Sequence, residues 1–233
     1  MPYTSRSISI SYSKYSETSI IAKLFTKKNG LQSFIIRGVR KKKSKNKLGF
    51  FQPLQLSEIT ASLSKRKNLQ TLHDICLTNV KLKKMMSTRN DLIAVFVAEV
   101  LSKILHEGEA DDKLFEYIWN VKLLLNDETP VDLNFPLLFL LQLSNFLGFS
   151  PLKENLLNIY FNIEQGCFVN KKSNMTLTQE NSLYLKALLN KNKIHIPYKN
   201  RNQLLEILIK YYKFHDHELK NLTSHIIIES LRS

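Results

Sequence analysis

The stretch that decides the fold of the first third of the chain is residues 18–39, TSIIAKLFTKKNGLQSFIIRGV. Two segments rich in apolar residues, 18–26 and 31–39, flank the turn sequence Lys27-Lys28-Asn29-Gly30. An Asn-Gly pair fits the positive φ angles of a type I′ turn. The sequence therefore predicts a β-hairpin here.

Three further strand candidates lie on either side of this hairpin. Residues 5–12 alternate polar side chains with Ile8 and Ile10, which is the period-2 pattern of a half-buried strand. Residues 50–62 and 69–80 follow a basic stretch. Five short strands in so short a segment suit a small closed barrel, because closure removes exposed edges. Among such barrels, the five-stranded oligonucleotide-binding (OB) fold has the right size.

The rest of the chain has the three- and four-residue apolar spacing of helices. We expect helices over residues 90–105, 112–125, 133–147, 178–189, 201–214 and 219–231. A small hairpin or irregular insert is expected near 155–175. The predicted fold class is therefore α+β, with an N-terminal OB-fold domain over residues 1–80 followed by an all-helical domain over 81–233.

The charge of the chain is unevenly distributed. There are 34 Lys and Arg against 20 Asp and Glu, for a formal net charge of +14. Residues 1–80 carry 15 basic and 3 acidic side chains, whereas residues 81–233 carry 19 and 17. An AT-rich genome raises the lysine content of a protein, but it does not remove acids from one third of it. The asymmetry indicates an N-terminal module that faces a polyanion.

The densest basic segment is residues 37–47, in which seven of eleven side chains are cationic and none is acidic. A loop of this kind can follow a phosphate backbone, because each contact releases condensed counterions. The expected DNA-binding residues are Arg37, Arg40, Lys41, Lys42, Lys43, Lys45 and Lys47, with Lys14, Lys27 and Lys28 expected on neighbouring turns. The alternative is a solvated loop with no ligand. Nearby, Phe34, Phe50 and Phe51 either stack on bases or fill the barrel.

Signals for catalysis are weak. The sequence has no phosphate-binding G-x-x-x-x-G-K-[ST] loop, no H-E-x-x-H and no G-x-S-x-G. His215-Asp216-His217-Glu218 holds residue types that bind metals, but it lies where one predicted helix ends and the next begins. We interpret it as a surface helix junction, with a metal-dependent nuclease using His215, His217 and Glu218 as the alternative. Asp111 and Asp112 are interpreted as helix capping.

Two cysteines are too few for a four-thiolate zinc site or a disulfide framework. We expect Cys76 to lie in the core and assign no role to Cys167. The sequence has no apolar run long enough to span a bilayer and no signal-peptide pattern. We therefore expect a reduced, cytosolic, non-enzymatic protein with no membrane partner and no cofactor.

A set of short motifs resembles the DNA repair protein RecO family. In order, these motifs are Tyr15-Ser16-Glu17-Thr18-Ser19, Leu24-Phe25-Thr26, Gly30, Arg37-Gly38-Val39-Arg40, Phe51-Gln52-Pro53-Leu54, Ala98-Glu99-Val100-Leu101, Leu147-Gly148-Phe149-Ser150-Pro151, Tyr160-Phe161-Asn162 and Gly166-Cys167-Phe168. Their order and spacing resemble the family over most of the chain, and the last 60 residues match only loosely.

The resemblance implies an OB barrel followed by a helical domain, and a recombination mediator without catalysis. Such proteins bind single- and double-stranded DNA and anneal complementary strands. They work with the ring-forming partner RecR and help to load the RecA recombinase onto coated single strands. They also bind the acidic C-terminal tail of the single-stranded-DNA-binding protein. The resemblance thus implies a cytoplasmic protein associated with the nucleoid.

The sequence departs from the family pattern in two places. Many members carry a four-cysteine zinc site after the L-G-F segment, but residues 151–169 offer only Cys167. We therefore expect no zinc, and we expect residues 160–168 to fold without it. Some members hold the tail peptide with basic residues on the preceding helix, but residues 137–146 contain no Lys or Arg. A different function for the same barrel, as an RNA-binding or ribosome-associated module, stays open.

Overall fold

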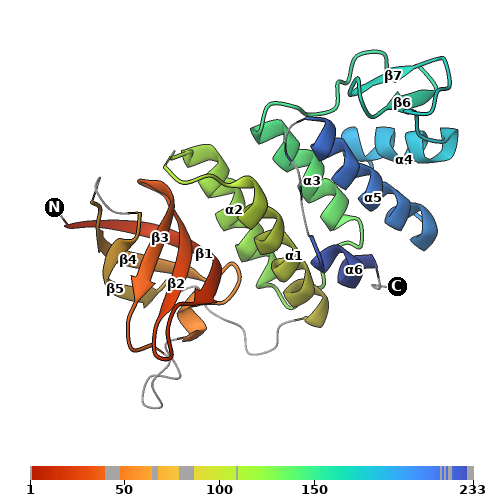
Figure 1. The fold of residues 1–233 in the computed structure, drawn as a ribbon. Coiled ribbons are helices and arrows are strands. Elements are labelled where there is room, and N and C mark those ends of the chain that lie inside the picture. Colours follow the sequence, from red (N-terminus) through yellow and green to blue (C-terminus); the bar gives the residue numbers. More distant parts are fainter. Residues whose placement is uncertain are drawn as a thin grey trace. The chain divides into compact units, whose positions relative to one another are not determined.

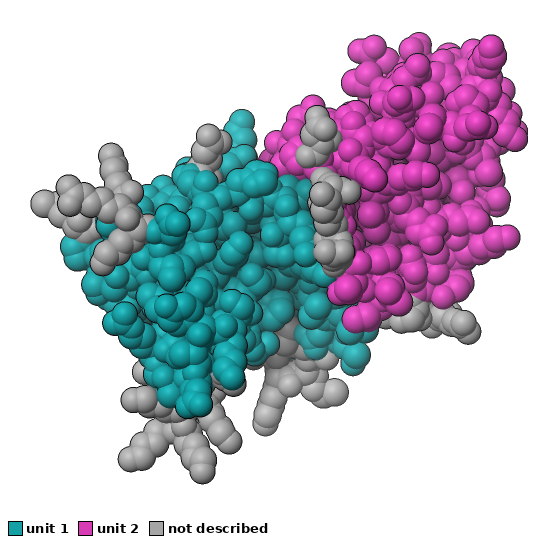
Figure 2. Space-filling model, viewed as in Figure 1, with its two compact units in different colours: residues 1–131 teal, residues 132–233 magenta. Residues whose placement is uncertain are grey.

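The structure is a computed structural model that describes residues 2–39, 48–64, 68–78, 87–108, 110–215, 217, 219 and 222–229. The chain divides into two compact units, residues 1–131 and residues 132–233 (Figure 2). Within the described residues, no helix is long and apolar enough to cross a membrane.

The first unit contains a closed five-stranded barrel (Figure 1). Its strands are β1 (Pro2–Lys14), β2 (Ile20–Thr26), β3 (Gly30–Ile36), β4 (Leu56–Ser62) and β5 (Gln70–Leu77). They are joined in the order β1-β2-β3-β5-β4, and β4 pairs with β1 to complete the barrel. The contact of β3 with β5 is parallel and the other contacts are antiparallel. The predicted OB-type barrel is confirmed.

The β2–β3 hairpin forms as predicted, but its turn is not of type I′. A type I′ turn needs positive φ angles at both central residues, and in this turn the positive φ occurs at Gly30, at 64°, and not at Asn29. The hydroxyl of Thr26 fixes the turn instead. It donates to the carbonyl of Gly30 at 2.9 Å and accepts from the backbone N–H of Asn29 at 3.1 Å. The dipeptide alone did not reveal this competing side-chain contact.

The barrel is filled by apolar side chains from its strands and from the β3–β4 connection. The buried cluster comprises Ile20, Ala22, Leu24, Phe34, Val39, Phe51, Ile59 and Ala61. Leu48 and Phe50 are partly buried against the same cluster. The chain therefore leaves the barrel at Val39 and returns to it at Leu48, so both ends of the intervening segment are fixed by core packing.

Two helices complete the first unit beside the barrel, namely α1 (Thr88–Ile104) and α2 (Asp112–Leu125) (Figure 1). The ring of Phe115 on α2 lies 5.6 Å from that of Phe25 on β2. The carboxylate of Asp111 accepts from the backbone N–H of Leu114 at 2.9 Å, which confirms its predicted capping role. The unit therefore extends beyond residue 80, where the sequence predicts a domain boundary. The domain boundary at residue 80 stays a prediction.

The second unit is built from helices around a small hairpin. Its elements are α3 (Phe135–Phe146), β6 (Tyr160–Asn162), β7 (Cys167–Val169), α4 (Gln179–Leu189), α5 (Tyr198–Phe214) and α6 (Ser224–Glu229). Helices α3 and α5 pack together, and the hydroxyl of Tyr212 donates to the carbonyl of Leu140 at 2.6 Å. Gly148, with φ of 83°, follows the end of α3, as its position in the sequence predicts. Helix α6 begins at Ser224, later than the predicted residue 219, and the predicted end at residues 230–231 lies outside the described residues.

Candidate nucleic-acid interface

The structure separates the four described members of the predicted DNA-binding set into two groups at opposite ends of β2. Lys14 at the end of β1 pairs with Ile20, the first residue of β2. Lys27 and Lys28 follow Thr26, the last residue of β2. Seven residues of strand separate these positions by about 20 Å. The expectation that Lys14, Lys27 and Lys28 lie on neighbouring turns is therefore wrong, because the two turns join opposite ends of the same strand.

The first group forms what we call the basic rim, namely Lys14 and Arg37. Ile20 pairs with Ile36, so the end of β1 and the end of β3 flank the start of β2. Both cations are exposed. The β4–β5 connection returns to this end as well, because the first residues of β5 pair with Phe34 and Ile35. The basic rim therefore brings together the β1–β2 and β4–β5 loops, where OB folds bind oligonucleotides.

The longest basic segment adjoins the basic rim. Its residues Arg40, Lys41, Lys42, Lys43, Lys45 and Lys47 lie outside the described residues. The segment follows Arg37 and Gly38, and the φ of 73° at Gly38 turns the chain where it leaves the strand. Buried Val39 then anchors the segment at the barrel core. The DNA-binding role of these six residues stays a prediction.

Two tyrosines that the sequence analysis did not select stand beside Lys14. Tyr12 is 41% exposed and Tyr15 is 57% exposed. The backbone N–H groups of Tyr15 and Ser16 both donate to the carbonyl of Ser19, at 3.0 and 3.2 Å, which holds the turn closed. Exposed aromatic rings beside a cation have the chemistry needed to stack on unpaired bases. The signal for them in the sequence was the interleaving of Tyr and Lys in residues 12–15, whereas only phenylalanines were considered as stacking residues.

Those phenylalanines belong to the barrel. Phe34 and Phe51 are 0% and 1% exposed and are members of the core cluster. Phe50 is partly buried against that cluster. The alternative in which they fill the barrel is therefore correct. Each lies within or next to an apolar run, so burial competes with base stacking for the same ring.

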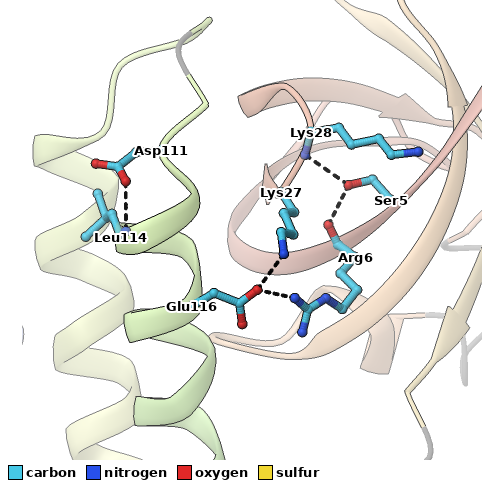
Figure 3. Close-up of polar contacts among 7 residues, drawn as sticks. All are labelled: Ser5, Arg6, Lys27, Lys28, Asp111, Leu114 and Glu116. Carbon is cyan, nitrogen blue, oxygen red and sulfur yellow. Dashed lines mark hydrogen bonds and ion pairs between the residues drawn. The ribbon is translucent and has the colours of Figure 1, made fainter.

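At the opposite end of β2, two cations of the barrel share one carboxylate of helix α2 (Figure 3). The ammonium of Lys27 donates to Oε1 of Glu116 at 2.7 Å, and Nη2 of Arg6 donates to the same oxygen. The hydrogen bond from Lys27 and the positive charge of Arg6 lower the pKa of Glu116 below its ordinary value, although partial desolvation opposes them. Lys28 is exposed, and its backbone N–H donates to the hydroxyl of Ser5 at 3.2 Å.

Arg6 is held by aromatic side chains as well as by Glu116. Its guanidinium lies 4.8 Å from the ring centroid of Trp119 and 5.5 Å from that of Phe115. Guanidinium groups at this distance are attracted by the ring faces. Arg6 and Glu116 are 110 residues apart in the sequence, so no local motif joins them.

The position of Cys76 differs from the sequence expectation. Cys76 is exposed on β5 and does not lie in the core. The charge of Asp74 is the main cause that raises the pKa of its thiol, so this cysteine is not activated as a nucleophile. Within the described ranges, no group of three or more His, Cys, Asp and Glu side chains is placed to hold a metal ion.

The described histidines of the 215–218 segment pack on an aromatic ring. His215 and His217 stack on Phe149 with centroid distances of 5.2 and 4.8 Å. His215 caps the end of α5, which agrees with the helix-junction interpretation. Glu218, the third residue of the alternative nuclease site, lies outside the described residues.

The predicted insert near residues 155–175 contains a two-stranded hairpin, β6–β7. Phe161 and Phe168 face each other across it with ring centroids 5.1 Å apart, and both are buried. The hydroxyl of Tyr211 on α5 donates to the carbonyl of Phe149 at 2.5 Å, and its ring lies 5.8 Å from that of Phe161. The hairpin is thus packed through aromatic side chains.

Comparison with known proteins agrees with this architecture. A family model described as "Recombination protein O N terminal" matches residues 1–80, and one described as "Recombination protein O C terminal" matches residues 90–222. The DNA repair protein RecO of Flavobacterium psychrophilum is 30% identical over 223 residues, covering 92% of each chain. The protein of the same name from Christiangramia forsetii is 31% identical over 219 residues, covering 90% of each. With a closed OB-type barrel, a following set of helices and matches that extend over nearly the whole length, the chain belongs to the RecO family of DNA repair proteins.

Proposed function

We propose that this chain is a non-catalytic recombination mediator that binds DNA through the barrel. The observation that carries the proposal is the position of the basic rim, where the two loops that bind oligonucleotides in OB folds meet. Lys14 and Arg37 are exposed there, and the residue 40–47 segment continues from Arg37. The rings of Tyr12 and Tyr15 can stack on any base, and the cations Lys14 and Arg37 can contact any phosphate. Such a surface binds single strands without regard to their sequence.

The contacts proposed for this surface are of two kinds. Lysine and arginine side chains neutralise phosphates, which gives affinity without reading the sequence. Tyr12 and Tyr15 stack on unpaired bases, which favours single strands over duplexes. Lys23 is partly exposed on β2, between the basic rim and the Lys27 turn.

Annealing follows from the same electrostatics. Two complementary strands repel each other through their phosphates, and a surface that neutralises both lowers that repulsion. We further propose that the protein acts with a RecR-like ring protein and with the tail of the single-stranded-DNA-binding protein, at the nucleoid in the cytoplasm. The test is a strand-annealing assay on bare strands and on strands coated with that protein. Failure to accelerate annealing on either substrate would contradict the proposal.

The salt dependence of binding tests the site. If four or five cations of residues 37–47 contact phosphates, the slope of log K against log salt for a single strand is about −3. Replacing Lys41, Lys42 and Lys43 with Ala should lower affinity and make the slope shallower by up to about 2. The measurement is fluorescence anisotropy of a labelled oligothymidylate across a salt series.

A matched control removes three exposed lysines from the other unit. The variant with Lys171, Lys172 and Lys193 changed to Ala has the same net charge as the barrel variant. It should keep the slope of the wild-type protein. An unchanged slope in the barrel variant, or an equal loss in the control, would refute the assignment to the barrel. Tighter binding to a matched RNA strand than to DNA would favour the RNA-binding alternative.

A further inference from the structure

One carboxylate stands between two barrel cations at the end of β2 remote from the basic rim. Glu116 Oε1 accepts from Arg6 and from Lys27, whose ammonium lies 2.7 Å away (Figure 3). The side chains of Glu116 and Lys27 are 39% and 35% exposed, so solvent and solutes can reach the pair. The cluster thus pairs two cations with one carboxylate.

The two cations differ in what else holds them. The guanidinium of Arg6 also lies over Trp119, which is 7% exposed, and over Phe115, which is 0% exposed. Arg6 therefore keeps its place when its anionic partner changes. The backbone N–H of Lys27 donates to the carbonyl of Arg6 at 3.0 Å, which fixes the start of its side chain next to Arg6. The long, flexible stem of Lys27 lets its ammonium exchange one oxygen anion for another.

A phosphodiester and a carboxylate suit such a pair of cations equally. Both present anionic oxygens that accept charge-assisted hydrogen bonds from guanidinium and ammonium groups. We infer that Arg6 and Lys27 form a second phosphate position for a nucleic-acid backbone, and that Glu116 occupies the place of the phosphate in the unbound protein. The inference rests on the proposed binding of nucleic acid to the barrel. Exposed Lys28 adjoins this position and adds to its positive charge.

The consequence is that Glu116 weakens binding. A strand must displace the carboxylate from Lys27 before its phosphate gains that cation. Removing the charge of Glu116 should therefore tighten binding by roughly two- to fivefold, the range that corresponds to a partly exposed ion pair. One additional cation is then available to the strand, so the salt slope should become steeper by about 0.7.

The experiment compares Glu116→Gln with Glu128→Gln in the full chain. Both variants raise the net charge by one, but Glu128 is exposed in the turn after α2. Binding of a labelled oligothymidylate is measured by anisotropy at several salt concentrations. Glu116→Gln should bind more tightly than Glu128→Gln and show the steeper slope. Equal affinities for the two variants would overturn the inference.

A double-mutant cycle tests whether the effect passes through Lys27. In a Lys27→Gln background, Glu116→Gln should give a smaller gain, because Lys27 is gone and only Arg6 is released. A full gain in that background would overturn the assignment. If Glu116→Gln does not fold, a comparison of Lys27→Gln with Lys28→Gln tests whether Glu116 weakens the contribution of Lys27 to binding. The paired Lys27 should contribute less affinity than the exposed Lys28, and an equal loss would overturn the inference.

The position formed by Arg6 and Lys27 could bind either a nucleic-acid backbone or free phosphate. Inorganic phosphate, added as a competitor at constant ionic strength, separates the two. If the position binds a nucleic-acid backbone, inorganic phosphate should displace the strand from the Glu116→Gln variant no better than chloride does. Strong displacement would assign the position to free phosphate and overturn the assignment to a nucleic-acid backbone. Failure of the wild-type protein to bind any strand at low salt would instead refute the proposed function, so the two failures are distinguishable.

Discussion

Replacing Gly166 with Ala should destabilise the protein more than the same change at Gly108 or Gly148. Those two glycines also have a positive φ, but they have open space where a Cβ would stand. Gly166 lies in the turn of the β6–β7 hairpin with φ of 66°. Its N–H donates to the carbonyl of Asn162 at 2.9 Å, and its carbonyl accepts from the N–H of Leu152 at 2.7 Å. These bonds on both sides of the residue prevent the backbone from relaxing to another conformation.

The expected cost has two parts. Placing Ala in the left-handed region costs about 1–2 kcal/mol. The added Cβ would also stand 3.0 Å from the hydroxyl oxygen of Tyr211. That tyrosine is 1% exposed and its hydroxyl is bonded to the carbonyl of Phe149, so it has little room to move. Overpacking of this kind costs about 1–3 kcal/mol. The total is therefore about 2–5 kcal/mol.

Urea unfolding followed by circular dichroism measures this loss, and two other glycines supply controls. Gly148 has φ of 83°, and a Cβ added there would meet no atom within 4 Å, so Gly148→Ala shows the backbone part alone. Gly49 also has open space and no positive φ, so Gly49→Ala should be nearly neutral. The excess of Gly166→Ala over Gly148→Ala should be about 1–3 kcal/mol.

A second background separates steric contact from other causes. Tyr211→Phe removes the hydroxyl that the new methyl group would meet, at the cost of its hydrogen bond. Gly166→Ala should therefore cost less in the Tyr211→Phe background than in the wild-type protein. If Gly166→Ala is no more destabilising than Gly148→Ala, or if its cost is the same in both backgrounds, the packing argument is refuted.

Two further outcomes are expected. Changing Tyr12 and Tyr15 together to Ala should weaken single-strand binding by at least about fivefold without altering the salt slope, since stacking contributes about 1–3 kcal/mol per base. Changing both to Phe should retain affinity, and a loss in the Phe variant would contradict stacking. Because the pKa of Glu116 is lowered in the folded protein, its ion pairs stabilise the fold above the ordinary value of 4.5 and are lost as pH falls through the folded value. The stability difference between wild type and Glu116→Gln in urea should therefore shrink on acidification below 4.5, and a constant difference would contradict the ion-pair role.

Much of the fold was predictable because the determining signals are local. Alternating Ile8 and Ile10, the hairpin at Gly30 and the apolar spacing of α1 each lie within one element. The turn type was missed because the Thr26 hydroxyl bonds the turn from outside the Asn-Gly pair. The exposure of Cys76 was missed because β5 has few buried side chains, so its apolar residues do not imply a buried strand.

The candidate site was predictable only as a region. Charge counting located it within residues 1–80, because that segment has 15 basic but only 3 acidic side chains. It could not assign cations to one end of β2 or the other, since strand pairing decides which turns lie together. Nor could it identify Arg6 and Glu116 as partners, because their contact depends on how α2 packs beside the barrel.

The position of α2 also changes what the positive charge of the barrel means. Residues 1–131 carry 22 basic and 12 acidic side chains, so the helices of this unit and their connections bring acids to a barrel that has few of its own. Two of those acids contact the barrel directly, as Glu107 accepts from the hydroxyl of Ser33 and Glu116 accepts from Lys27. Both contacts lie away from Lys14 and Arg37, which are exposed. A polyanion should therefore meet the basic rim first, and it should gain Lys27 only by displacing a carboxylate. Initial binding would then depend on the rim, whereas the extent of contact along β2 would depend on Glu116.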